Sequence, residues 1–465
     1  MGEETAVAIP DVGAEAVELL GELIRLDTVN PPGNEEPGQE LLAARLSDAG
    51  FECELLAAIP GRPNLVARLP GESEGETLCL LGHVDTVPAD ASEWTFDPWV
   101  GDVAEGMVRG RGAQDMKGQV AAEVAAAASL AREGWRPTAG ELKVVITADE
   151  EMGAAHGAQW LCSEHPKAVR ADLVVNEGGG ASFELAGRRF YPLCVGEKGV
   201  NRFLLRARGA AGHASVPGLG DNALLKLAPA LLRLREQPPL EPTEEGIAFL
   251  SALLEEPVSS DRAGLEAAVE RLRTLSPLLT TFLAEPMLRV TMVPTKASAS
   301  EKDNVIPSHA EVLVDCRVPP GGGADQVSAR IEEVLGPLAG ELEVEFTERV
   351  VGNRSPSETP LSEAIAAWLA EADPDATLVP IVMPGFSDSH WFRKAFGSST
   401  VYGFCPQREL DLFRAAPLVH GADERAAVAD IELAAAFFAD LPQRVLQGGG
   451  ARQGEAEPGR GGRCL

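Results

Sequence analysis

Several short apolar segments of this chain end abruptly in acidic or imidazole side chains. The apolar run in TLCLLGHVDT stops at a histidine, and the run in LKVVITADEE stops at three acids. The run in ADLVVNEGGG stops at Asn-Glu followed by glycines. Short apolar runs that stop at polar residues are typical of buried strands in a parallel sheet, and such sheets bind ligands beyond the carboxyl ends of their strands. We therefore expect these polar side chains to meet at one edge of a sheet.

Strands and helices alternate over most of the chain. Residues 118–133 are rich in alanine and predict a helix, and similar helical patterns recur before the first strands and near the end of the chain. The expected fold class is α/β, a mostly parallel sheet with helices on both faces. Between about residues 200 and 352 the pattern changes to meandering strands beside two helices, which predicts an inserted α+β domain.

The charge and the cysteines exclude several classes of protein. The formal net charge is −31, so nucleic acid or an anionic membrane would be repelled. No apolar run reaches the ~18 residues of a membrane helix, and the acidic N-terminus lacks a signal-peptide pattern, so we expect a cytoplasmic protein. The seven cysteines are scattered and never in CxxC spacing, which disfavours a disulfide framework or a thiolate metal site.

Five side chains have the chemistry of ligands for divalent metal ions. Imidazole and carboxylate suit zinc, and these groups are supplied by His83, Asp115, Glu151, Glu177 and His420. All five follow or adjoin apolar segments, so they occupy similar positions in the expected fold. This shared placement favours a two-metal hydrolase.

Each of these motifs alone also has a purely structural interpretation. Asp85 would fix the imidazole of a metal ligand at His83, or would simply bond to a histidine that caps the sheet. Asp115 would bridge two cations or cap the helix that follows it. Glu150 and Glu151 would crowd a metal site, with one as ligand and the other as general base, or would form a solvated acidic turn.

The order of the motifs resembles that of one known family. From about residue 15 to 445 the chain contains, in sequence, LLGHVDTVP, WTFDPWVGDVAEGMVRGRGAQDMKG, TADEEMG, EKGV, GAAGHASVP, NVIP, VDCRVPPG, GFSDS and VHGADE. This order is similar to that of the zinc-dependent metallopeptidases and amidohydrolases that include aminoacylase, acetylornithine deacetylase and succinyl-diaminopimelate desuccinylase.

The resemblance implies how the metal ligands divide. Asp115 would bridge two zinc ions, for which cobalt or manganese would be substitutes, and the peptide bond after it would be cis. His83 and Glu177 would complete one site, and Glu151 and His420 the other.

The resemblance also implies the roles of the other site residues. Glu150 would be the general base toward a metal-bridging water, and Asp85 would support His83. In the inserted domain, a histidine would reach the active site of a neighbouring subunit, which implies a homodimer. This histidine would be His213. Asn304 and Arg317 would bind the carboxylate of the substrate, and Gly385 would line the same pocket.

The changes of pattern and composition along the chain give the domain limits, and the resemblance gives the domain roles. Residues 1–199 and 353–447 would form the two parts of a catalytic domain, residues 200–352 a lid or dimerisation domain, and residues 448–465 a disordered tail. Residues 237–285 form a longer insert than in the smaller family members, which leaves the lid shape and the substrate size open.

Three classes of function are to be distinguished for this sequence. The favoured one is a di-zinc hydrolase of amide or peptide bonds, of the N-acyl amino acid deacylase or the dipeptidase and carboxypeptidase type, acting on a small molecule. A non-catalytic binding relative with the same fold would lack ligands, yet every ligand position and the base are filled. A hydrolase of phosphate or sugar substrates would want a phosphate loop, and GxxxxGK[ST] is absent.

Overall fold

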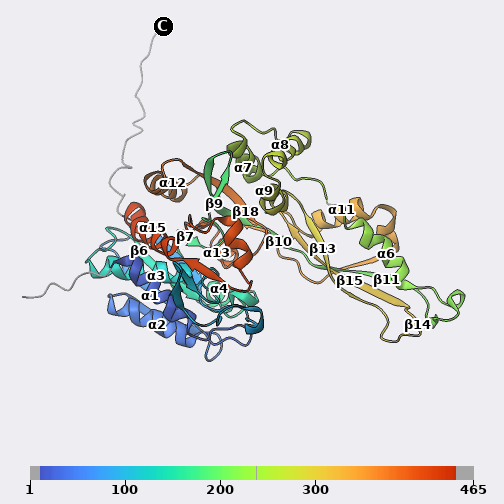
Figure 1. Cartoon of the computed structure of the whole chain (residues 1–465), viewed down its shortest axis with the longest axis horizontal. Helices are drawn as coiled ribbons and strands as arrows, with labels where there is room; N and C mark the ends of the chain where they lie inside the picture. Colours follow the sequence, from blue (N-terminus) through green and yellow to red (C-terminus); the bar gives the residue numbers. More distant parts are fainter. Residues whose placement is uncertain (1–10, 237, 447–465) are drawn as a thin grey trace, which may run out of the picture.

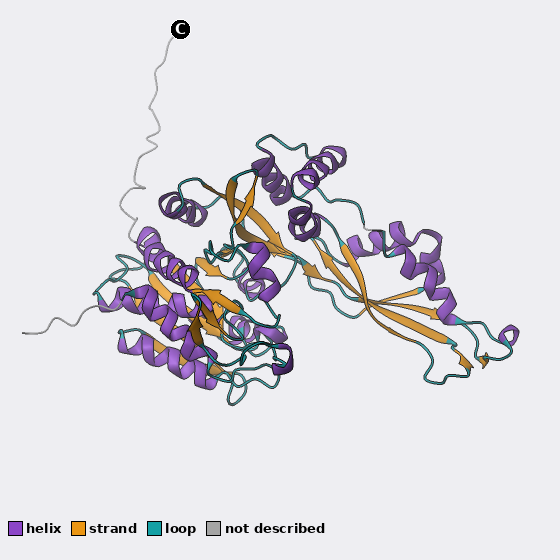
Figure 2. Ribbon diagram, in the orientation of Figure 1, coloured by secondary structure: helices purple, strands orange, loops and turns teal. Residues whose placement is uncertain are grey.

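The computed structural model describes residues 11–236 and 238–446, so the predicted disordered tail lies outside the described residues. A larger α/β unit carries a second, elongated sheet that projects from it (Figure 2). Within the described ranges, no helix is both long enough and apolar enough to span a bilayer.

A ten-stranded mixed sheet forms the centre of the larger unit. Its strands are β1 (Glu52–Ala57), β2 (Pro63–Pro70), β3 (Thr77–His83), β6 (Glu141–Thr147), β7 (Leu173–Asn176), β8 (Phe183–Leu185), β9 (Arg188–Glu197), β17 (Asn353–Arg354), β18 (Ala376–Met383) and β19 (Thr400–Gly403). The main path is β1-β2-β6-β3-β7-β19-β9-β17, with β8 and β18 paired to β9. Strands β6, β3, β7 and β19 are parallel, while β1, β2 and β17 are antiparallel to their neighbours.

Helices cover both faces of this sheet because its central strands are apolar on both sides. In β3, Leu78 and Leu80 face one core while Cys79 and Leu81 face the other. The first face carries α1 (Val12–Ile24), α2 (Glu36–Asp48), α3 (Lys117–Arg132), α12 (Pro360–Ala372) and α15 (Val428–Leu446), and the second carries α4 (Ala158–Glu164), α5 (Pro166–Val169) and α13 (Ser389–Ala395). Helices α1, α3 and α15 lie side by side (Figure 1). The predicted fold class is confirmed.

The second unit is built on a five-stranded antiparallel sheet. Its strands are β10 (Gly199–Val200), β11 (Phe203–Arg208), β13 (Thr291–Ser298), β15 (His309–Val318) and β16 (Glu343–Phe346). Strand β15 alternates buried and more exposed residues, so one face forms a core with α6 (Ala223–Arg233) and α11 (Ala324–Leu335). The short strands β12 (Gly212–His213) and β14 (Val305–Ile306) pair at the end farthest from the larger unit (Figure 1).

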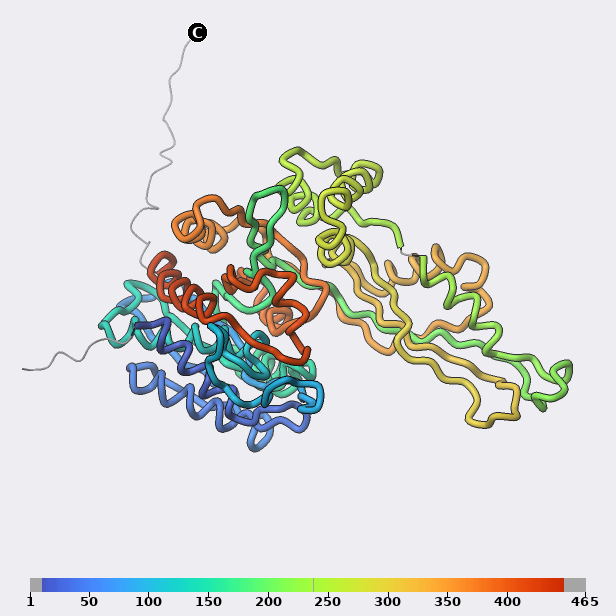
Figure 3. The backbone as a smooth tube through the Cα atoms, in the orientation of Figure 1, coloured from blue at the N-terminus to red at the C-terminus, as the bar shows by residue number. Residues whose placement is uncertain are grey.

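The predicted insert does not pack on the five-stranded sheet. Its helices are α7 (Glu244–Leu254), α8 (Arg262–Leu275), α9 (Pro277–Leu279) and α10 (Glu285–Leu288). They share a hydrophobic core with β8, β9 and β18 of the larger unit instead. The chain therefore leaves the larger unit after β9, returns for α7 to α10, leaves again at β13 and returns at β17 (Figure 3). The domain limits remain a prediction.

Four short elements complete the surroundings of the site. Strands β4 (Asp102–Ala104), β5 (Met107–Arg109) and β20 (Arg425–Ala427) form a small sheet, and α14 (Leu412–Ala415) precedes the loop that carries His420. Strand β20 pairs with β5, so the loop before β20 is held beside the segment that leads to Asp115.

Candidate metal centre

The five candidate ligands converge at the carboxyl ends of the central parallel strands. His83 ends β3, Glu151 follows β6 and Glu177 follows β7, while Asp115 and His420 come from loops. Ligand atoms of His83, Asp115 and Glu177 all lie within 4.8 Å of one another, and so do those of Asp115, Glu151 and His420. The chain therefore brings two histidines and three acids from distant positions into two adjoining groups.

One carboxylate belongs to both groups. Oδ1 of Asp115 lies 3.2 Å from Nε2 of His83, and its Oδ2 lies 3.1 Å from Nε2 of His420. The peptide bond between Asp115 and Met116 is cis, as expected. A carboxylate whose two oxygens face different imidazoles is placed to bridge two cations.

Glu150 and Glu151 face different parts of the centre. After β6, Asp149 takes a left-handed backbone conformation with φ of 66°, and residues 150–152 form one tight helical turn. Oε2 of Glu151 lies 3.1 Å from Nε2 of His420, whereas Oε2 of Glu150 lies 4.0 Å from Nε2 of His83. Glu150 belongs to neither ligand group. This turn therefore directs the two neighbouring carboxylates to different histidines, and the division into one ligand and one general base stays a prediction.

A layer of hydrogen bonds holds His83 and the acidic turn together. Nδ1 of His83 lies 3.1 Å from the backbone oxygen of Asp85, so the proton sits on Nδ1 and Nε2 is left for a cation. The Asp85 carboxylate accepts from the backbone N–H groups of Glu150 and Glu151, each at 3.2 Å. It also accepts at 2.8 Å from the side-chain amide of Asn30, whose sequence signal was only an Asn-Pro-Pro loop.

The sequence reasoning also missed Glu424, which shapes the loop that carries Asp115. This fully buried carboxylate accepts from the guanidinium of Arg111 at 2.6 Å and from the backbone N–H groups of Gly112, Gln114 and Asp115 at 3.0, 2.8 and 3.1 Å. Its only sequence signal was its place in VHGADE. The motif VHGADE therefore supplies the candidate ligand His420 and, four residues later, Glu424, which holds the loop of the candidate ligand Asp115.

Loss of the Arg111–Glu424 pair is expected to destabilise the fold strongly. Arg111→Met leaves a buried carboxylate without its cation and should lower the free energy of unfolding by about 3–5 kcal/mol. Arg109→Met is the matched control, because its pair with Asp102 leaves 28% and 42% of the two side chains exposed, against 3% and 0% for Arg111 and Glu424. The control should cost less than about 1 kcal/mol. Urea unfolding followed by circular dichroism measures both, and equal losses would contradict the expectation.

The electrostatics and the hydrogen bonding of the centre fit bound cations. Burial raises the pKa of Glu150 and of Glu177 well above the ordinary range, and neighbouring carboxylates add to the effect. Hydrogen bonds to Asp115 and Glu151 raise the pKa of His420 to about 10. Oε1 of Glu151 is buried and has no hydrogen-bond partner among the described residues. Crowded acids that retain protons, with an oxygen left over, are the groups that divalent cations deprotonate and bind.

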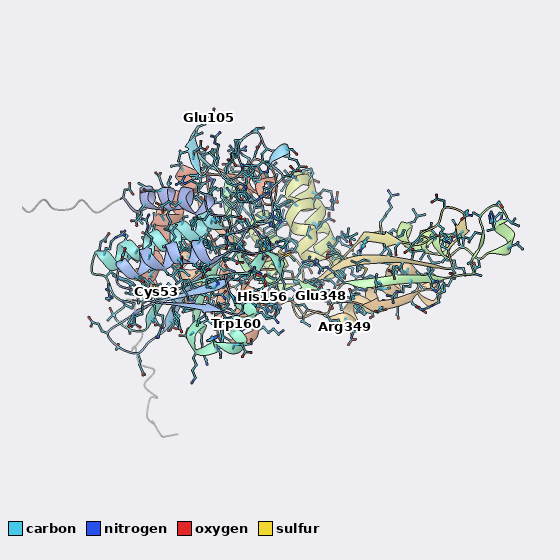
Figure 4. The ribbon with its side chains drawn as sticks, turned by 90° about the horizontal axis from the view of Figure 1, so that it is seen from below. Cys53, Glu105, His156, Trp160, Glu348 and Arg349 are labelled. Carbon is cyan, nitrogen blue, oxygen red and sulfur yellow. The ribbon has the colours of Figure 1, made fainter. Side chains whose placement is uncertain are left out.

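A cavity of about 1060 Å³ opens beside the two groups. Acidic residues of the metal centre line it from the larger unit, and two arginines line it from the elongated sheet. Among its lining residues are Glu150, Glu151, Glu177, Arg202, Arg317, Glu348, Gly385 and His420. Glu348 lies where the elongated sheet meets the larger unit (Figure 4). The cavity is therefore lined by both units together.

Two of the predicted site residues lie elsewhere. His213 and Asn304 are exposed at the far end of the elongated sheet, and neither lines the cavity. They are close to each other, since the backbone oxygen of Asn304 accepts at 2.9 Å from the N–H of Ala214. A single chain therefore does not bring these two residues to its own metal centre.

Comparison with known proteins places the chain among amide hydrolases. The sequence pattern of Peptidase family M20/M25/M40 matches residues 79–444. A succinyl-diaminopimelate desuccinylase from Rhodospirillum centenum is 30% identical over 444 residues, which cover 93% of this chain and 98% of the relative. An enzyme of the same name from Xanthobacter autotrophicus is 36% identical over 251 residues, which cover 52% of this chain and 62% of the relative.

The fold comparison agrees with the sequence comparison. An M20 family metallo-carboxypeptidase from Sulfolobus solfataricus has a similar fold, with a TM-score of 0.68 at 18% identity over 92% of this chain and 98% of that one. The family match and these relatives show that the protein is a hydrolase that acts on amide bonds. The chain belongs to Peptidase family M20/M25/M40, which confirms the resemblance inferred from the order of its motifs.

Proposed function

We propose that this protein is a two-metal hydrolase that deacylates an N-acyl amino acid or cleaves a short peptide with a free carboxylate. The observation that carries the proposal is the position of Asp115, whose two carboxylate oxygens face His83 and His420 at 3.2 and 3.1 Å. A non-catalytic relative would have no need for a free acid such as Glu150 beside two complete ligand groups.

The metal ions would be zinc, with cobalt or manganese as substitutes. His83, Asp115 and Glu177 would hold one ion, and Asp115, Glu151 and His420 the other. When bound, the two ions would polarise the amide carbonyl and lower the pKa of water.

Glu150 would act as the general base and then as the general acid. Its carboxylate lines the cavity and lies outside both ligand groups. It would accept a proton from water as the water oxygen attacks the carbonyl carbon, and it would return that proton to the nitrogen as the carbon–nitrogen bond breaks. Asp85 would keep His83 oriented throughout, because it fixes the proton on Nδ1.

Arg317 would bind the carboxylate of the substrate. It lines the cavity, and its Nε donates to Asp315 at 2.8 Å, which holds the guanidinium at the wall. A planar guanidinium pairs with a carboxylate through two parallel hydrogen bonds, which favours substrates with a free carboxylate near the cleaved bond. Gly385 would line the same pocket without a side chain.

His213 would act in the centre of a second chain, so the working form would be a homodimer. Its imidazole is exposed at the far end of the elongated sheet, with Nδ1 2.7 Å from the hydroxyl of Ser215. A second copy of the chain would place His213, with Asn304 beside it, at the oxyanion and at the substrate of its partner.

A hydrolysis screen tests the proposed function directly. Protein stripped of metal by a chelator should release no amine from N-acyl amino acids or dipeptides, and addition of zinc, cobalt or manganese should restore turnover. Released amine is measured with ninhydrin, and the amount of bound metal is measured by atomic absorption. Turnover that is equal before and after stripping would contradict a metal-dependent reaction.

A further inference from the structure

One wall of the cavity beside the metal centre is apolar. Four residues line the cavity and also belong to the hydrophobic core around β9 and β18, namely Leu283, Ile381, Met383 and Leu412. Leu283 comes from the turn between α9 and α10, so it is contributed by the insert whose role the sequence left open. The insert thus forms part of the cavity that holds the metal centre.

The surrounding structure holds this wall in place. The rings of Phe282 and Phe413 meet edge to face with centres 6.0 Å apart, which links the turn of Leu283 to α14. The sulfur of Met287 accepts at 3.3 Å from the backbone N–H of Val382, which links α10 to β18. The buried amine of Lys198 donates at 2.7 and 2.6 Å to two backbone carbonyls at the end of α10. The wall is therefore a fixed surface.

The arginines of the cavity come from the elongated sheet and not from the four residues of the apolar wall. Among its described lining residues, the arginines are Arg202 and Arg317 of the elongated sheet, and there is no lysine. Arg202 is already paired with Asp315 at 2.8 Å and with Glu348 at 2.5 Å. The four wall residues offer neither a charge nor a hydrogen-bond donor from their side chains, so a carboxylate placed against them would lose its hydration without compensation from the wall, which is unfavourable.

We propose that the apolar wall binds the acyl chain and that the enzyme prefers aliphatic acyl groups of medium length to a succinyl group. The inference rests on the proposed function, in which Arg317 binds the carboxylate of the amino acid. That carboxylate belongs to the amine half of the substrate, so the acyl half is left for the wall that contains Leu283. The preference would differ from the activity named for the desuccinylases similar to this chain.

The test compares three acyl groups on the same L-amino acid, using the full-length, zinc-loaded protein. Burial of each methylene is worth about fourfold in affinity, so burial of the four additional methylenes of the N-hexanoyl derivative should raise kcat/KM about 250-fold over that of the N-acetyl derivative. The N-succinyl derivative should be no better than the acetyl one.

Two alanine variants show whether the wall causes the preference. Leu283→Ala should lower the hexanoyl-to-acetyl ratio about fivefold, because it removes aliphatic contacts with the longer chain. Leu272→Ala is the matched control, since Leu272 is an equally buried leucine of the same core in α8 and does not line the cavity. This control should leave the ratio unchanged. If Leu283→Ala fails to fold, Leu412→Ala at a half-buried position of the wall is expected to lower the same ratio.

The outcomes separate the inference from the function beneath it. A succinyl derivative cleaved as fast as the hexanoyl one, or a ratio that neither wall variant lowers, would overturn the inference and leave the proposed function standing. If no acyl amino acid and no dipeptide is cleaved by the metal-loaded protein, both are overturned.

Discussion

Replacement of Glu150 by glutamine is expected to lower kcat by about 10²–10⁴-fold without loss of bound metal. The amide has the shape of the carboxylate but does not accept the proton that the reaction removes from water. Glu150 lies 4.0 Å from Nε2 of His83 and outside both ligand groups, so the ions should stay bound. The measurements are kcat on the best substrate of the screen and metal content per chain by atomic absorption.

Glu105→Gln serves as the control for this loss of charge. Glu105 is exposed at the turn between β4 and β5, on the surface of the larger unit (Figure 4). Its variant should keep full activity. If Glu150→Gln also kept full activity with its metal bound, another group would be the base and the proposed mechanism would be wrong.

His213→Ala is expected to lower kcat by about 10²–10³-fold, the usual loss when one donor to an oxyanion is removed. Co-expression of this variant with Glu150→Gln should restore activity, because a mixed dimer has one centre with both Glu150 and a partner's intact histidine. If half of the dimers are mixed and half of their centres are complete, about a quarter of the wild-type activity returns. The measurement is the specific activity of the co-expressed proteins against each variant alone.

His309→Ala is the control for this exchange. His309 is another exposed histidine of the elongated sheet, at the start of β15 and paired in register with Arg208 of β11. Its loss should change neither activity nor complementation. A monomeric His213→Ala protein that turns over at the wild-type rate, or a mixture no more active than its parts, would contradict action across subunits.

The meeting of three candidate ligands was predictable because each follows a strongly patterned segment, whereas Asp115 and His420 come from loops. Metal binding by these residues stays a prediction. The apolar runs before His83, Glu151 and Glu177 predicted buried parallel strands, and parallel strands necessarily bring their ends together. The alanine-rich segment likewise predicted α3, since seven of its sixteen residues are alanine, the residue with the highest helix propensity. The sequence pattern therefore predicted secondary structure where apolar residues or alanine dominated a segment.

Other parts of the molecule could not be predicted in this way. Asn30 donates to the side chain of Asp85, and Glu424 accepts from backbone N–H groups such as that of Asp115, in both cases far away in the sequence. A lone polar residue in a loop does not reveal such a partner. The sequence of residues 237–285 indicated an insert but not the surface on which it packs. That surface, on β9 and β18, is formed by residues from both sides of the insert.

The divided origin of this core has a consequence for biosynthesis. Helices α7 to α10 emerge from the ribosome after β9, but β18 begins at residue 376, well beyond the end of α10 at residue 288. At about 5–20 residues per second, translation reaches β18 about 4–18 s later. During that interval the apolar faces of the nascent helices lack strand β18, which covers them in the folded protein. Apolar surface exposed during this wait makes the newborn polypeptide prone to aggregation and a target for chaperones.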